Sequence, residues 1–283
     1  MEEEIKDFWQ MNPCGAELVG DFSSETREAY EDFFRRYDDY RYTKEAHILT
    51  NLDRIDFKGK KVLEIGLGQG ADAEQIIRRE GIYSGVDLTH EAAKRTETRF
   101  RLKNLEYEEV KQGSVLALPF EDAYFDIVFS HGVLHHVPDI KRAQKEIYRV
   151  LKPSGELIVM FYAKWSLNYL AAISVVRRLG LIGIYASGAN ISGIYRQHLE
   201  NAKKLGLWNY LKMSNFIHTN TDGPLNPYSK IYDVNEVKKD FPNFEVVKSH
   251  KHFMHAPPLK VNWLKMDSLL GWHLWVHLKP KKN

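Results

Sequence analysis

The chain has 283 residues, of which 43% are hydrophobic and 28% charged, with a formal net charge of +2. This balance is ordinary for a globular protein and gives no charge-based sign of a nucleic-acid or membrane surface. The single cysteine, Cys14, excludes an intramolecular disulfide and a multi-cysteine zinc site. The acidic N-terminus does not resemble a signal peptide, and we find no run of about 18 apolar residues. We therefore expect a cytoplasmic protein with no transmembrane segment.

Residues 1–24 read as irregular, because Asn12-Pro13 and Cys14-Gly15 are breakers. From Glu25 to Leu52 aromatic residues recur at helical spacing, with Ser23 or Ser24 as candidate caps. We interpret the aromatic stripe as a packing face; the alternative is a helix that covers a ligand site.

The segment KVLEIGLGQG, residues 61–70, predicts a buried strand followed by a glycine turn. A helix from Ala71 to Arg79 follows. Such a turn brings backbone N–H groups close to a polar nucleotide ligand. The glycines at positions 66, 68 and 70 are spaced G-x-G-x-G, which is not the G-x-G-x-x-G dinucleotide fingerprint. Glu64, two residues before the first glycine, can accept a cationic ligand or brace the loop.

A second strand, residues 82–87, ends at Asp87, which lies 23 residues after Glu64. An acid at this place can hydrogen-bond two ribose hydroxyls; the alternative is a helix-capping carboxylate. Thr89 then caps a helix that runs to about Leu102.

Three further strands are predicted, at residues 107–111, 125–130 and 156–162. The turn GSVLALPF follows the third, HGVLHHVPD follows the fourth, and a helix from Ile140 to Leu151 precedes the fifth. Lys152 to Gly155 is predicted as the stop and turn after that helix. Five strand–helix units in this order imply a parallel, doubly wound α/β sheet.

We therefore divide the whole chain into four parts: an N-terminal cover (1–54), a core (55–162), a lid insert (163–240) and two strands that complete a seven-stranded sheet (241–283). These strands are residues 244–247 and 271–278. We interpret the apolar segment Leu167 to Ile184 as a lid helix packed on the sheet. Alternatively, it lines an apolar pocket or lies on a membrane surface.

These motifs resemble those of class I S-adenosylmethionine (SAM)-dependent methyltransferases, and the stretch from Tyr124 onwards resembles the UbiE-like branch. The resemblance covers residues 55–162. It implies SAM as cofactor and S-adenosylhomocysteine as product. If the helix that begins near Glu25 covers this cofactor, Arg41 and Tyr42 lie near its carboxylate. Many family members carry an acid where this chain has Ser114. The cofactor-binding residues implied are Arg41, Glu64, Gly66, Gly68, Gly70, Asp87, Leu88, Ser114, Val115 and Ser130.

Methyl transfer needs a base only where the acceptor must lose a proton. His131, the first ionisable residue after strand four, is the predicted catalytic base. His135 and His136 are interpreted as structural or pocket-shaping. The candidate substrate-binding residues are Tyr162, Trp165, His218, Asn220 and Tyr228; the last three could instead form a loop that satisfies its own polar groups.

We expect a small-molecule acceptor, including an apolar one, methylated on oxygen first, then nitrogen or carbon. The alternatives are an NAD-dependent oxidoreductase, a tRNA methyltransferase and a non-catalytic binding protein on the same fold. His250, His252 and His255 have a metal-like spacing, but no cysteine or carboxylate completes it, so no metal is predicted. The oligomeric state stays open.

Overall fold

The computed structural model describes residues 1–15, 19–20, 24–189, 191–261 and 263–282. Within these ranges seven strands form one sheet with the order β3-β2-β1-β4-β5-β7-β6. The first five strands are parallel, whereas β7 is antiparallel to β5 and to β6. This is the predicted α/β sheet with an antiparallel hairpin at one edge. The strands are β1 (Lys61–Ile65), β2 (Ile82–Asp87), β3 (Glu109–Gln112), β4 (Phe125–His131), β5 (Leu151–Tyr162), β6 (Phe244–His252) and β7 (His273–Pro280).

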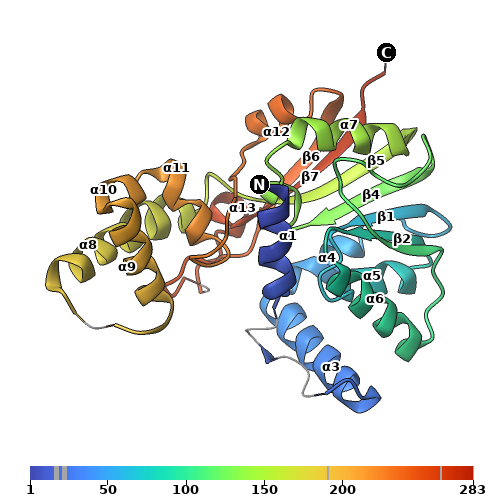
Figure 1. Ribbon diagram of the computed structural model, residues 1–283. Coiled ribbons are helices and arrows are strands. Elements are labelled where there is room, and N and C mark those ends of the chain that lie inside the picture. Colours follow the sequence, from blue (N-terminus) through green and yellow to red (C-terminus); the bar gives the residue numbers. More distant parts are fainter. Residues whose placement is uncertain (16–18, 21–23, 190, 262, 283) are drawn as a thin grey trace.

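Helices cover both faces of the sheet, as Figure 1 shows. Successive strand residues point to opposite faces, so Leu63 joins a core with Ile147, whereas its neighbour Val62 joins a second core with Ile76. Strands covered on both faces are apolar throughout, which is why β1, β4 and β5 were readable from the sequence. The covering helices are α7 (Ile140–Val150) and α12 (Val234–Asp240) on one face, and α4 (His47–Leu52), α5 (Ala71–Arg78) and α6 (His90–Lys103) on the other.

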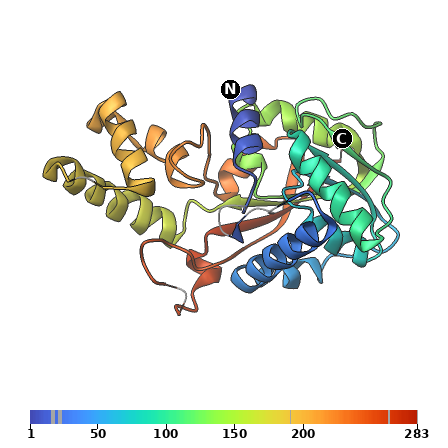
Figure 2. The ribbon, with the colours of Figure 1, turned by 60° about the horizontal axis from the view of Figure 1, so that its bottom comes forward.

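The N-terminal stretch contains a helix, α1 (Glu2–Met11), where we predicted irregular chain. Three glutamates in its first turn complement the positive end of the helix dipole, and Ile5 and Phe8 are buried. The breakers at Asn12-Pro13 end this helix and do not prevent it. Figures 1 and 2 show α1 between the sheet and a second lobe of the chain.

The predicted helix from Glu25 to Leu52 is two helices, α3 (Arg27–Lys44) and α4. Thr26 caps α3, because its hydroxyl accepts from the Ala29 N–H. The predicted cap Ser24 is therefore wrong, and the other candidate, Ser23, lies outside the described residues. The aromatic stripe is a packing face as predicted, since Tyr30, Phe33, Phe34 and Tyr37 are all buried.

Residues between β5 and α12 form the second lobe, which Figure 2 shows beside the sheet. Its core contains Ile173, Leu181, Tyr210 and Phe216, and Trp272 from the sheet end packs into it. Its elements are η2 (Asn168–Arg177), α8 (Arg178–Ser187), α9 (Gly193–Leu205), α10 (Leu207–Tyr210), α11 (Met213–Phe216) and η3 (His218–Asn220).

The continuous helix Asn168–Ser187 has a mean hydropathy of 1.4 and is 17% buried. Our expectation that no segment is long and apolar enough to cross a membrane is therefore wrong by length and composition. Those two properties alone do not separate a membrane span from a packed helix. In this structure the Arg177 guanidinium ties the helix to the rest of the lobe, donating to the backbone carbonyl of Asn220 at 2.6 Å.

The predicted turn at Lys152 to Gly155 is also wrong. Strand β5 begins at Leu151, directly after α7, and a register irregularity opposite Phe125 and Ile127 of β4 accommodates these residues. At the other edge β6 runs to His252, well beyond the predicted end, because it pairs with β7 over its length. A short helix, α13 (Asp267–Leu270), precedes β7.

Candidate functional site

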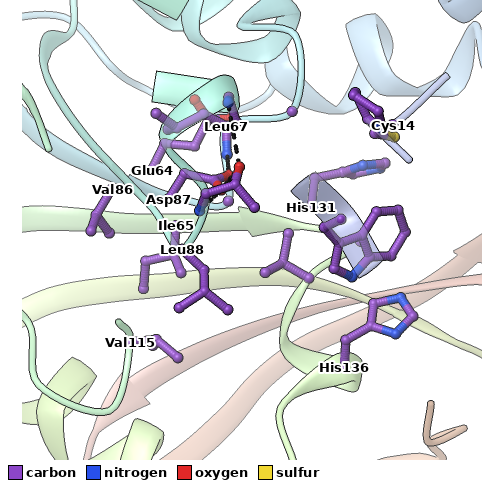
Figure 3. A pocket seen from close by; sticks show the side chains of 18 of the residues that line it. Cys14, Glu64, Ile65, Leu67, Val86, Asp87, Leu88, Val115, His131 and His136 are labelled. Carbon is purple, nitrogen blue, oxygen red and sulfur yellow. Dashed lines mark hydrogen bonds between the residues drawn. The ribbon is translucent and has the colours of Figure 1, made fainter. Parts of the chain in front are cut away.

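A cavity of about 170 Å³ lies at the carboxyl ends of β1, β2 and β4, drawn in Figure 3. Ligands of α/β sheets bind at this edge, where the strand order reverses. The lining comes from the glycine loop, the Gly113–Val115 turn, the loop after β4 and helix α1. The predicted cofactor residues that line it are Arg41, Glu64, Gly66, Gly68, Asp87, Leu88, Ser114 and Val115.

Two predicted cofactor residues lie outside this lining. Gly70 faces α6, where a Cβ would sit 3.1 Å from the Cα atom of Thr96, so this glycine allows α5 and α6 to pack closely. Ser130 is buried and donates its hydroxyl to the backbone carbonyl of Ile65 at 3.0 Å, which joins β4 to β1. Both are structural in this arrangement.

The glycine loop holds Gly66 at φ +81° and Gly68 at φ +53°. Both angles favour glycine, because a Cβ is strained there. A Cβ on Gly66 would lie 2.2 Å from a methyl carbon of Val133, in the loop after β4. Glycine therefore lets these two cavity loops approach each other.

We expect Gly66→Ala to destabilise the protein by about 2–5 kcal/mol, from left-handed strain plus the overlap with Val133. Gly59→Ala is the matched control, because Gly59 has φ +66° but nothing within 4 Å of its added Cβ. It should cost only about 1–2 kcal/mol. Urea unfolding of both variants measures the difference, and equal losses would contradict the packing role of Gly66.

Glu64 is 2% exposed, and its carboxylate accepts a hydrogen bond from the Tyr83 hydroxyl at 2.6 Å. Burial raises its pKa well above the ordinary value, and the nearby Asp72 adds to this. This bond joins β1 to β2, so bracing of the glycine loop by Glu64 stays a prediction. A cationic ligand group in the cavity would favour the charged form again.

The carboxylate of Asp87, at the end of β2, accepts hydrogen bonds from the glycine loop and from the start of α6. One carboxylate oxygen accepts from the Leu67 N–H at 2.8 Å, and the other accepts from the N–H and hydroxyl of Thr89, each at 2.8 Å. Thr89 caps α6 as predicted, through Ala92. A carboxylate offers about four acceptor sites, so Asp87 keeps capacity for a ligand in the cavity.

Arg41, which also lines the cavity, pairs with Asp72 at 2.5 Å between its Nη2 atom and Oδ2. The same Nη2 lies 3.1 Å from Nδ1 of His131. A guanidinium only donates, so Nδ1 accepts and the hydrogen of His131 is on Nε2. Burial lowers the pKa of His131 well below its usual value, and the Arg41 charge adds to this, so the imidazole is neutral.

Sequence reasoning missed the cavity residues of the N-terminal stretch. Glu2, Ile5 and Trp9 of α1, together with Cys14, line the cavity. Glu2 also accepts from the Ser114 hydroxyl at 2.8 Å, which ties α1 to the turn after β3. The usable signal was the apolar spacing within MEEEIKDFWQM after an acidic first turn.

None of the five predicted substrate residues lines the cavity, nor does any described residue of 163–240. Trp165 is 56% exposed and lies elsewhere. His218 contacts the backbone of Ser229, and Asn220 donates to the Phe216 carbonyl at 2.9 Å. The polar loop satisfies its own groups, which is the alternative that the sequence left open. Tyr162 and Tyr228 instead contact side chains beside the cavity, described below.

The three histidines at 250, 252 and 255 form no ligand group with a carboxylate among the described residues. Histidines gather at two other places, in each of which the potential ligand atoms lie within 4.8 Å of one another. One group is Glu45, His47, His131 and His273, and the other is His135, His136 and Asp222.

The strand order, the cavity beyond β1 and β2, and the acid that ends β2 define a class I SAM-dependent methyltransferase fold. Residues 63–159 match the family model described as a methyltransferase domain. This stretch thus matches a methyltransferase domain, which agrees with the resemblance drawn from the motifs. The assignment to a UbiE-like branch stays a prediction.

Curated relatives match over the same part of the chain. A phthiotriol/phenolphthiotriol dimycocerosates methyltransferase of Mycobacterium tuberculosis is 35% identical over 104 residues, 36% of this chain and 37% of that protein. Phosphoethanolamine N-methyltransferase 2 of Caenorhabditis elegans is 32% identical over 111 residues, 38% of this chain and 25% of that protein. The match therefore spans about a third of the length of the first relative and a quarter of the second.

Solved structures extend the likeness in fold over most of the chain. A SAM-dependent methyltransferase from Mesorhizobium loti has a TM-score of 0.54 at 13% identity, covering 83% of this chain and 97% of that one. A SAM-dependent methyltransferase from Aquifex aeolicus has a TM-score of 0.51 at 13% identity, covering 90% and 98%. At this identity the comparison supports the fold alone.

Proposed function

We propose that the protein transfers the methyl group of SAM to a small-molecule acceptor and releases S-adenosylhomocysteine. The observation that carries the proposal is one cavity that joins the glycine loop, Glu64 and Asp87 at the switch point of the sheet. The residues fit a nucleoside with a cationic centre. The glycines leave the backbone accessible to a ligand, and two acids, buried Glu64 and half-buried Asp87, line the cavity where such a ligand offers positive charge or hydrogen-bond donors.

The acceptor is proposed to be small and, among small molecules, apolar or lipid-like. Two relatives are named for a lipid and for phosphoethanolamine as substrates. The second lobe also exposes large apolar side chains, including Leu179 at 63% and Trp208 at 73%. Oxygen is the favoured acceptor atom, followed by nitrogen or carbon.

When bound, SAM supplies a methyl group on a sulfonium, and the chain has to align the acceptor and, for a hydroxyl, remove its proton. Neutral His131 faces the cavity, but its Nδ1 atom accepts from Arg41. Arg41 is also the residue predicted to hold the cofactor carboxylate. If it turns to that carboxylate, Nδ1 is released with a free lone pair, and His131 becomes competent to take the proton. Cofactor binding and base activation are thereby coupled through Arg41.

The test is incubation of the purified protein with methyl-labelled SAM and a panel of phenols, fatty hydroxy compounds, amines and tRNA. We expect S-adenosylhomocysteine and a labelled small molecule to appear together. Label in tRNA alone would instead favour the nucleic-acid alternative. No product with any acceptor, despite SAM binding, would favour a non-catalytic binding protein.

A further inference from the structure

Two buried polar atoms face each other beside the cofactor cavity without a hydrogen-bond partner. They are Nε2 of His136 and Oδ2 of Asp222, 3.4 Å apart. His136 belongs to the short helix η1 (Leu134–His136) after β4 and is 4% exposed, whereas Asp222 comes from the second lobe. Figure 3 shows His136 at the edge of the cavity, which it helps to line. An unpaired buried polar atom is costly, so the pair calls for an explanation.

The surrounding contacts fix which atoms carry hydrogens. Nδ1 of His136 lies 2.7 Å from the backbone carbonyl of Tyr228 and 3.1 Å from the Ser229 hydroxyl; the carbonyl can only accept, so Nδ1 carries a hydrogen and donates to it. The Tyr162 hydroxyl donates to Oδ1 of Asp222 at 2.6 Å, which leaves Oδ2 free. Nε2 and Oδ2 therefore face each other at a distance that either a second proton on His136 or a metal ion between the two atoms would satisfy.

A third group completes the set. His135 is fully buried, and both of its ring nitrogens lack a hydrogen-bond partner among the described residues. One atom each from His135, His136 and Asp222 lies within 4.8 Å of the other two.

We propose that His135, His136 and Asp222 bind a divalent transition-metal ion, with zinc as the best match. Zinc bonds of about 2.0–2.2 Å in tetrahedral geometry place a nitrogen and an oxygen ligand about 3.4 Å apart. The separation of the two orphaned atoms is 3.4 Å. The hydrogen bonds from Nδ1 of His136 to a carbonyl and from Tyr162 to the carboxylate are of the kind that orients metal ligands.

The other group of potential ligands is less suited to a cation. His47 and His273 already hydrogen-bond each other, at 3.1 Å between Nε2 and Nδ1. The positive guanidinium of Arg41 contacts His131, the third histidine of that group. In the proposed site, by contrast, every atom offered to the metal lacks a partner.

The site joins the core to the second lobe, because its ligands come from both. Three protein ligands leave a fourth position of a tetrahedral ion open. That position lies beside the cofactor cavity, where His136 is part of the wall. The ion would therefore fix the lobe against the cavity, a role that does not depend on the methyl-transfer proposal.

The test is isothermal titration of the EDTA-treated, dialysed protein with zinc chloride, together with thermal unfolding with and without zinc. We expect one zinc per chain and a raised melting temperature. Asp222→Asn should weaken zinc binding at least 100-fold. Without metal this variant should be as stable as the wild type or more so, since its side-chain amide can donate to Nε2 of His136. His135→Gln should also lose zinc and gives a second variant should Asp222→Asn fold poorly.

The matched control is His47→Gln, which changes the other histidine group and should keep the wild-type zinc affinity. Loss of zinc binding in His47→Gln with retention in Asp222→Asn would overturn the assignment. Failure of the wild-type protein to bind zinc, cobalt or nickel would also overturn it. Nε2 of His136 and Oδ2 of Asp222 would then share a proton in place of a metal ion.

Discussion

Asp87→Ala should weaken SAM binding by about 2–4 kcal/mol, which is roughly a 30- to 1,000-fold loss of affinity. The proposed ligand contacts are charge-assisted hydrogen bonds from two ribose hydroxyls to the carboxylate, and such bonds are the stronger kind. The structure adds a second reason. Asp87 also holds the Leu67 N–H of the glycine loop and the start of α6 at Thr89, so its loss loosens the loop that cradles the ligand. Isothermal titration with SAM measures the change.

A control separates direct binding from loop support. Thr89→Val removes the hydroxyl that donates to Asp87 and caps α6, but it leaves the carboxylate in the cavity. We expect it to lower the free energy of unfolding by about 1 kcal/mol with a small effect on affinity. Unchanged SAM affinity in Asp87→Ala would refute the ribose assignment. An equal loss in both variants would show that Asp87 acts through the loop.

His131→Ala should lower turnover by about 10²–10⁴-fold with a hydroxyl or phenol acceptor, while SAM affinity stays near that of the wild type. The expectation rests on its place at the end of β4, facing the cavity, with its Nδ1 atom freed when Arg41 leaves it. Because burial and the Arg41 charge lower the pKa of this histidine well below 6.5, it stays in the base form at acidic pH. The acid limb of the pH–rate profile should accordingly lie below 6.5. Steady-state kinetics with the acceptor found by the labelling test measures both.

Two results would contradict the base role. A variant that loses cofactor binding together with turnover would show that His131 shapes the loop. A small loss with intact binding would mean that alignment alone suffices, as for a neutral amine. Arg41→Lys serves as a comparison, since lysine keeps the charge but cannot form the two-pronged pair with Asp72. We expect it to weaken SAM binding more than His131→Ala does.

The sheet could be predicted because its signals are local. Buried strands, the glycine turn around Gly66, the acid at Asp87 and the Thr89 cap each occupy a few adjacent residues, and their order along the chain fixes the topology. Most of the predicted cofactor residues therefore line the cavity. Gly70 and Ser130 do not, because close packing of α5 on α6 and of β4 on β1 uses the same small residues as ligand binding does.

The remainder depends on contacts between distant segments. Helix α1 reaches the cavity because Glu2 accepts from Ser114, more than a hundred residues away, and no local pattern records that pairing. We predicted from the position of residues 163–240 after β5 that this lobe forms a lid over the acceptor site. Its polar residues hydrogen-bond within their own loop, and Asp222 reaches the cavity wall through His136. The mixture of polar and apolar residues that suits a pocket suits a self-contained lobe equally well.

The central claim, that the cavity beyond β1, β2 and β4 binds SAM, is tested most directly by isothermal titration of the wild-type protein with S-adenosylhomocysteine and, separately, with NAD. The account predicts saturable binding of one S-adenosylhomocysteine per chain, weakened roughly 30- to 1,000-fold in Asp87→Ala, and no heat of binding with NAD. Saturable binding of NAD without binding of S-adenosylhomocysteine would contradict it.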